Sequence, residues 1–107
     1  MAKCRITVLK CLFDQELKDR YVPDPDYGRC PFFQPGQVYE CTDGEEKPED
    51  FRCNVGWRSI QTEVKGFAGP KEEQHFFADR PQVVCCNDGI RPVLFLLERI
   101  EEESASE

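Results

Sequence analysis

Two adjacent cysteines, Cys85 and Cys86, are the residues of this sequence whose type and placement best suit chemistry. They precede Asn87-Asp88-Gly89, a three-residue turn in which Gly89 is expected to adopt a positive φ. The segments on both sides are apolar and rich in β-forming residues, so the pair lies at the mouth of a predicted β-hairpin. Thiolates bind metals and attack disulfides, which makes these thiols candidates for metal binding or thiol chemistry.

The first half of the chain contains the elements that must support this hairpin. Residues 5–13 alternate as an internal strand, with Cys11 on the face opposite Ile6 and Val8. Asp14 can cap a short helix that ends at about Tyr21. A type II turn is expected at residues 34–37, followed by a short strand at residues 38–41.

The second half adds a helix and the hairpin. The helix is expected to begin near Pro48, because proline suits a first helical turn. An apolar stripe at helical spacing marks its buried side. The stripe residues are Trp57, Ile60, Val64 and Phe67. The resulting order, β-α-β-α-β-β, predicts an α+β fold with a small, mostly antiparallel sheet, two helices and a C-terminal β-hairpin at its centre.

Length and charge narrow the class of protein. The 107 residues suit a single domain over residues 1–100, and the glutamate-rich residues 101–107 suit a disordered tail. The net charge is −7 and there is no basic patch, which argues against a nucleic-acid partner. No apolar run approaches the roughly 20 residues of a membrane span, and the start is not a signal peptide. We therefore expect a cytoplasmic protein without a membrane partner, and a protein partner or homo-oligomer fits this surface.

Seven cysteines without an export signal do not suggest a disulfide framework. Three of them, Cys4, Cys11 and Cys41, lie in expected strands, where burial is the simplest role. His75 is the only histidine, and its polar surroundings suit a surface position. Metal binding, thiol chemistry and packing therefore remain as the roles to weigh for the other cysteines.

Several segments resemble a family of small, uncharacterised bacterial and archaeal proteins. The residues that carry the resemblance are Cys85-Cys86-Asn87-Asp88-Gly89-Ile90-Arg91-Pro92-Val93 with Glu98-Arg99. Cys30-Pro31-Phe32-Phe33 resembles the Cys-Pro segment of that family, and residues 48–53 resemble its central element, which ends here at Cys53. The resemblance implies a shared small fold with cysteines at positions 30, 53, 85 and 86. It implies no reaction.

These four cysteines form our candidate site. Cys30, Cys53 and the Cys85-Cys86 pair are widely separated, unlike the CxxC pairs of zinc ribbons. Adjacent residues of a strand point to opposite faces, so only one of the pair can face a shared pocket unless the strand twists at its end. Three or four thiolates from this set could hold an iron–sulfur cluster or zinc.

Our leading hypothesis from the sequence is therefore a small metal or iron–sulfur protein with a redox or sulfur-related role. Two alternatives stay open. One is an interaction or accessory subunit whose cysteines only pack. The other is a metal-free thiol enzyme or sulfur carrier, which requires one unusually reactive cysteine.

Overall fold

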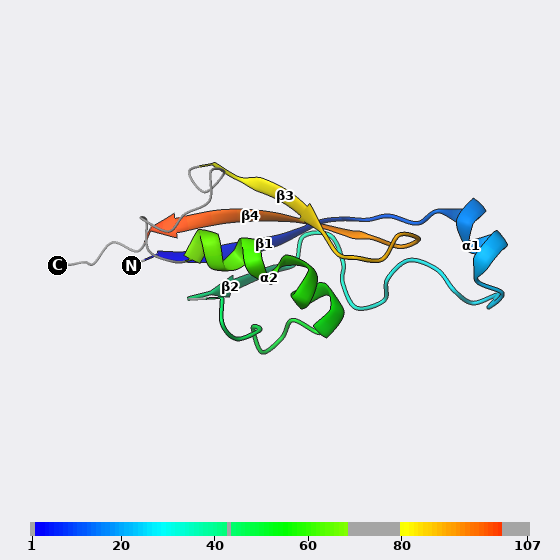
Figure 1. Ribbon diagram of the computed structural model, residues 1–107, viewed down its shortest axis with the longest axis horizontal. Helices are drawn as coiled ribbons and strands as arrows, with labels where there is room; N and C mark the ends of the chain where they lie inside the picture. The colour runs from blue at the N-terminus through cyan, green and yellow to red at the C-terminus, as the bar shows by residue number, and fades with distance from the viewer. Residues whose placement is uncertain (1, 43, 69–79, 102–107) are drawn as a thin grey trace.

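The protein is an α+β fold in which one antiparallel sheet carries a helix on one side (Figure 1). The computed structural model describes residues 2–42, 44–68 and 80–101. Its elements are β1 (Ala2–Cys11), α1 (Gln15–Tyr21), β2 (Val38–Cys41), α2 (Asn54–Ala68), β3 (Gln82–Cys85) and β4 (Val93–Glu101). The sheet order is β2-β1-β4-β3, and all neighbours are antiparallel. The predicted fold class, element order and C-terminal hairpin are confirmed, although only β4 of the hairpin is central.

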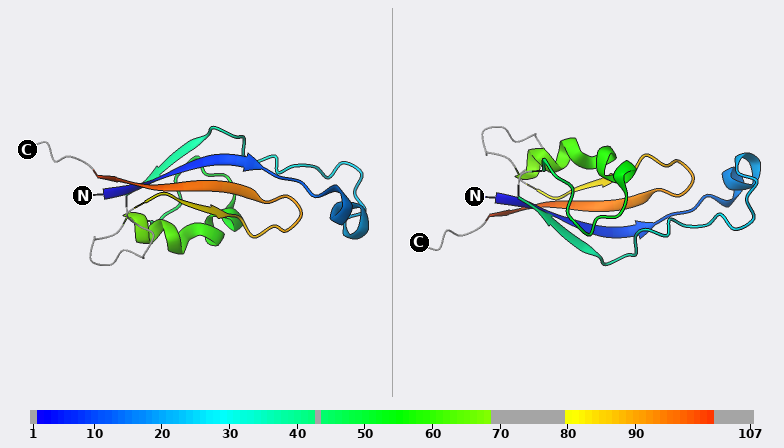
Figure 2. Two further views of the ribbon diagram at one scale, coloured as in Figure 1. Left: turned by 90° about the horizontal axis from the view of Figure 1, so that it is seen from above. Right: turned by 90° about the horizontal axis from the view of Figure 1, so that it is seen from below.

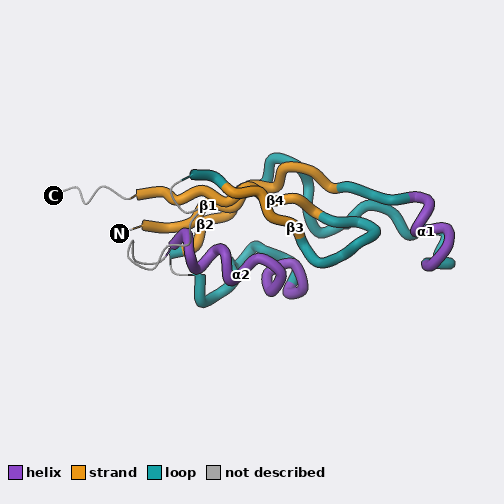
Figure 3. Tube along the Cα trace, turned by 45° about the horizontal axis from the view of Figure 1, so that its top comes forward, coloured by secondary structure: helices purple, strands orange, loops and turns teal. Residues whose placement is uncertain are grey.

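Helix α2 packs on one face of the sheet, and the hydrophobic core fills the space between them (Figures 2 and 3). The predicted apolar stripe of this helix is confirmed. All four of its residues are buried: Trp57, Ile60, Val64 and Phe67. Aromatic rings from Phe33, Phe51 and Phe95 fill the end of the core near the start of α2, with ring centroids 5.0–5.7 Å apart.

Strand β1 contains a β-bulge that changes which of its residues face the core. Val8 pairs with Phe95, but Lys10 pairs with Leu94, so one residue is inserted between them. Beyond the insertion, Cys11 is opposite the buried residue Val93 and lies on the same face as Val8. The simple alternation predicted for residues 5–13 was wrong here, because it placed Cys11 and Val8 on opposite faces.

Helix α2 begins later than the sequence predicted. It starts at Asn54 rather than near Pro48, because Cys53 occupies the cap position. The Cys53 carbonyl accepts the first helical hydrogen bond from Trp57, at 3.0 Å, and its sulfur accepts one from the Gly56 N–H, at 3.3 Å. The short helix α1 agrees with the prediction, since Asp14 caps it by accepting the Leu17 N–H at 3.0 Å.

The hairpin turn is built by Asp88 rather than by a left-handed glycine. Among the described residues only Gly36 and Gly44 have positive φ, so the conformation predicted for Gly89 was wrong. Instead, the Asp88 carboxylate accepts the N–H groups of Ile90 and Arg91 at 2.9 and 3.0 Å. The type II turn predicted at residues 34–37 does place positive φ at Gly36.

Some sequence expectations fall on parts of the chain that the structure does not describe. His75 and residues 102–107 of the expected acidic tail lie outside the described residues, while Glu101 ends β4. In the described ranges, neither helix has the length and apolar character needed to cross a membrane.

Candidate functional site

The sheet register shows which cysteine of the adjacent pair faces inward. Cys85 is opposite Leu94, and the next residue, Cys86, donates its N–H to the Val93 carbonyl at 3.0 Å. Val93 is fully buried in the core, so Cys86 lies on the core face and Cys85 on the opposite one. Their exposure agrees, because Cys86 is half-buried and Cys85 is exposed.

Cys11 approaches the same place from the other side of β4. It is the β1 partner of Val93, and the bulge turns it toward the core face. Cys11 and Cys86 therefore lie in one row across the sheet, with Val93 between them. Because neighbouring strands are roughly 4.8 Å apart, the two Cα atoms are about 10 Å apart.

Cys30 belongs to the loop that crosses the end of β1. The residue before it, Arg29, donates its Nε–H to the Cys11 carbonyl at 2.9 Å. Three residues after it, the Phe33 carbonyl accepts a hydrogen bond from the Cys11 thiol at 3.4 Å. A tight turn at Pro31-Phe32 connects these two contacts. Cys30 is consequently held next to Cys11, and we call Cys11, Cys30 and Cys86 the thiol cluster.

Electrostatics supports this proximity. Partial burial raises the pKa of the Cys11 thiol, and negative charge on Cys30 and on Cys86 raises it further, while Arg29 opposes the shift. A thiolate can only perturb a neighbour in this way when the two groups are close in space. The cluster can therefore hold one negative charge more easily than two.

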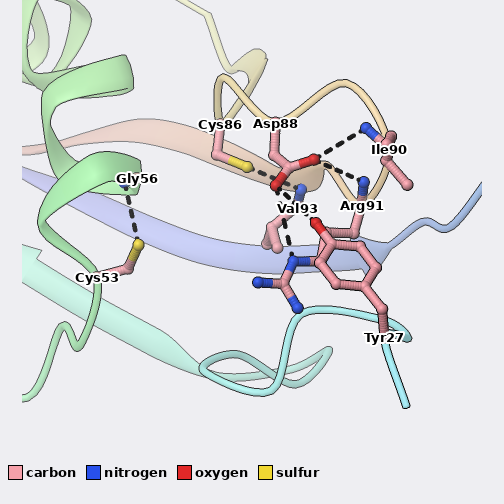
Figure 4. A network of polar contacts seen from close by, with 8 residues as sticks. All are labelled: Tyr27, Cys53, Gly56, Cys86, Asp88, Ile90, Arg91 and Val93. Carbon is pink, nitrogen blue, oxygen red and sulfur yellow. Dashed lines mark hydrogen bonds and ion pairs between the residues drawn. The ribbon is translucent and has the colours of Figure 1, made fainter. Parts of the chain in front are cut away.

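Cys53 has a defined structural role at the start of α2. Its sulfur points at the Gly56 N–H, just as the Cys86 sulfur accepts the Val93 N–H at 3.4 Å (Figure 4). Both cysteines pack partly buried against the core. These N–H···S hydrogen bonds fix the positions of the two sulfurs, and such bonds are also found at metal-bound sulfur.

A shallow hollow opens beside the inward cysteine of the hairpin. It has a volume of about 510 Å³ and lies between the first turns of α2 and the end of β3. Its lining residues are Val55, Arg58, Ser59, Cys85, Cys86 and Asn87. Arg58 is exposed and has no carboxylate partner among the described residues, so the hollow combines thiols with a positive charge.

A polar network fastens the loop that carries Cys30 to the hairpin turn (Figure 4). The Arg91 guanidinium lies 4.2 Å from the centroid of the Tyr27 ring, and the Tyr27 hydroxyl donates to Asp88 at 3.4 Å. Partial burial alone would raise the pKa of Asp88. The N–H groups of Arg91 and Ile90, the Arg91 charge and the Tyr27 hydroxyl outweigh it and lower that pKa. The carboxylate therefore stays charged and holds the turn and the loop together.

The structure thus places Cys30 and Cys86 of the predicted set on either side of Cys11, leaves Cys85 on the other face and places Cys53 at the start of α2. Across the ranges that the structure describes, no three side chains of His, Cys, Asp or Glu are grouped so as to hold a metal ion. The metal or cluster site therefore stays a prediction. The sequence did not predict that Cys11 belongs to the site. The β-bulge turns Cys11 toward the core face, and the alternating apolar pattern of β1 does not reveal a bulge.

Comparison of the chain with protein-family models, with curated proteins and with solved structures found no match in any of the three. The resemblance of the cysteine-containing segments to a small protein family accordingly stays a prediction. The function must therefore be inferred from the chemistry and geometry of the site.

Proposed function

We propose that this protein carries out thiol–disulfide exchange, with a redox role, through the thiol cluster. The supporting observation is that half-buried Cys11 is hydrogen-bonded to the segment that carries Cys30 and flanks Val93 together with Cys86, which itself lines an open hollow. A cysteine whose only role is packing would not need to line an open hollow, as Cys86 does. A reduced cluster of this kind suits the cytoplasm, where thiols are kept reduced.

The proposed reaction reduces a disulfide at the expense of two protein thiols. The Cys86 thiolate attacks one sulfur of the substrate disulfide, which forms a mixed disulfide and releases the first substrate thiolate. A second thiolate of the cluster then attacks the Cys86 sulfur and releases the other half of the substrate. Two protein thiols become one disulfide and give up two electrons and two protons, which the substrate takes up as two thiols.

Groups around Cys86 support this role. The Val93 N–H donates to its sulfur at 3.4 Å and so holds the side chain in place beside the hollow. Arg58 lines the same hollow and suits a substrate that carries a carboxylate or another negative group. The exposed neighbour Cys85 also lines the hollow, but it lies on the opposite face of β3 from the core.

The test is the reaction with dithiobis-nitrobenzoate, an aromatic disulfide that bears carboxylates and releases a coloured thiol. A Cys85→Ser variant removes the exposed thiol that would react trivially. In this variant we expect a second release of coloured thiol whose rate does not depend on probe concentration, because the second step is intramolecular. Adding Cys86→Ser should abolish that phase. A stable adduct on Cys86, with no second release, would contradict the proposal.

Metal or cluster binding is a second proposal, supported by a different observation. Backbone N–H groups donate to the sulfurs of Cys53 and Cys86, and such hydrogen bonds are common at cluster-binding sulfurs. Because the described residues hold no ready metal-binding group, Cys30, Cys53 and Cys86 would have to move together to bind iron–sulfur or zinc. This second proposal is tested by measuring metal and acid-labile sulfide in protein purified without oxygen. The content is compared between wild type and Cys53→Ala. Equal content in both would refute it.

A further inference from the structure

We propose that Cys11 and Cys30 form the disulfide in which the oxidised protein stores the two oxidising equivalents. This inference rests on the proposed exchange reaction and names its final pair. Cys11 lies at the end of β1 and Cys30 on the adjoining loop, so the bond would join two neighbouring segments without crossing the core.

Contacts on both sides of Cys30 carry the inference. Arg29 is fixed to the Cys11 backbone carbonyl at 2.9 Å, and Phe33 is fixed to the Cys11 sulfur at 3.4 Å. The turn at Pro31-Phe32 folds the short segment between these contacts back on itself. Both cysteines are partly buried and pack against the core. Disulfides need Cα atoms within roughly 7 Å, and these contacts hold the segment that carries Cys30 against the end of β1 that carries Cys11.

The other pairs of cysteines suit a stable disulfide less well. Cys11 and Cys86 flank Val93 with Cα atoms about 10 Å apart, which is too far for a disulfide without moving a strand. Cys4 and Cys41 are direct cross-strand partners, but both are buried. Burial also raises the pKa of Cys4 to about 12, so almost no thiolate is available there.

Cys30 lies on the loop between α1 and β2, and a loop position suits a transfer between the other two thiols. Its thiolate attacks the Cys86 sulfur of the mixed disulfide, forms a Cys30–Cys86 bond and releases the remaining substrate thiolate. The Cys11 thiolate then attacks the Cys30 sulfur and releases the Cys86 thiolate. One S–S bond breaks as another forms in each step, so no further oxidant is needed.

Oxidation at this pair should also have a mechanical consequence. The bond closes a loop over residues 11–30, which contains α1. Helix α1 has no buried residue and lies at the far end of the molecule from the start of β1 and the end of β4 (Figure 1). Because cross-linking a loop of this length restricts the unfolded chain, the thermal midpoint should rise by roughly 5 °C or more on oxidation.

The experiment maps the disulfides of the full chain after oxidation. One sample is oxidised with oxidised glutathione, which is a disulfide, and a second sample is oxidised with diamide. Diamide takes two electrons from thiols and is not itself a disulfide, so it separates this inference from the proposed function. Trypsin together with a glutamate-specific protease cuts after Glu40 and places Cys30 and Cys41 on different peptides. We expect a Cys11–Cys30 peptide pair with both oxidants, with Cys86 free.

The outcomes are distinct. If the Cys11–Cys30 bond forms with diamide but not with the added disulfide, the result would support the inferred disulfide pair and refute the exchange reaction. A final Cys30–Cys86 or Cys4–Cys41 bond would overturn the inference even if exchange occurs. In Cys11→Ser the reaction should stop at a Cys30–Cys86 bond, and the rise in thermal midpoint seen for wild type should be lost. An unchanged midpoint in wild type on oxidation would also count against the inference.

Discussion

Raising the pH should destabilise the protein through Cys4, whose thiol is buried between the sheet and the core. Burial, with a smaller effect of charge on Cys41, raises its pKa from 9.0 to about 12. The unfolded chain therefore loses this proton near pH 9, while the folded chain keeps it until about pH 12. The folded state binds more protons in this window, so the stabilising effect is complete below pH 9 and is lost as the pH rises toward 12.

The size of the effect follows from proton linkage. One group with different pKa values in the two states changes the free energy of unfolding by about 1.4 kcal/mol per pH unit inside the window. Cys4 alone should therefore lower the free energy of unfolding by about 1.4 kcal/mol between pH 8 and pH 10. This is a sizeable share of the stability of a small domain.

Urea unfolding under reducing conditions, followed by the fluorescence of the single tryptophan, Trp57, measures this change. Other groups also titrate, so the quantity to follow is the difference between wild type and Cys4→Ala. The variant should be less stable at pH 8, and the gap should narrow by about 1.4 kcal/mol at pH 10. An exposed control, Cys85→Ala, should leave the pH dependence unchanged. A constant gap for Cys4→Ala would refute the reasoning.

Three further predictions concern the backbone around the site. Gly44→Ala should lower the free energy of unfolding by roughly 1–3 kcal/mol, measured by urea unfolding, because φ is +78° and a Cβ would lie 2.9 Å from Lys65 Cγ. The control Gly28→Ala should cost far less, because a Cβ there would meet no atom within 4 Å. Asp88→Ala should cost about 1–2 kcal/mol near neutral pH. This cost should shrink once the pH falls through the lowered pKa of Asp88, because the protonated carboxyl no longer makes the charged contacts that hold the turn. Cys53→Ala should destabilise α2 by about 1 kcal/mol while Cys53→Ser, which keeps an acceptor, retains most of the stability; equal losses would exclude the capping role.

Much of the fold could be predicted because its signals are local. The stripe of α2 follows from helical spacing, and the cap of α1 follows from Asp14 before a helix-forming segment. The turn at Gly36 follows from the preceding proline. The start of α2 could not be predicted, because a cysteine seldom caps a helix and Pro48 offered a more familiar signal.

The candidate site was predicted in part, since its geometry depends on pairing between distant segments. Strand geometry predicts that only one of Cys85 and Cys86 faces inward. The register of β3 against β4 decides which of the two it is, and the sequence does not reveal that register. Cys11 was missed because the bulge before Lys10 changes its face without changing the residue pattern. The loop that carries Cys30 is held beside Cys11 by the hydrogen bond from Arg29, which no local pattern encodes.

The most direct test of the central claim is the thiol inventory of the protein after reaction with one equivalent of oxidised glutathione. Intact mass and differential alkylation should show a protein that is lighter by two hydrogen atoms and carries no glutathione. The two missing thiols should belong to the thiol cluster, while Cys4 and Cys41 remain reduced. A protein that keeps all its cluster thiols and carries glutathione only on the exposed Cys85 would contradict the account.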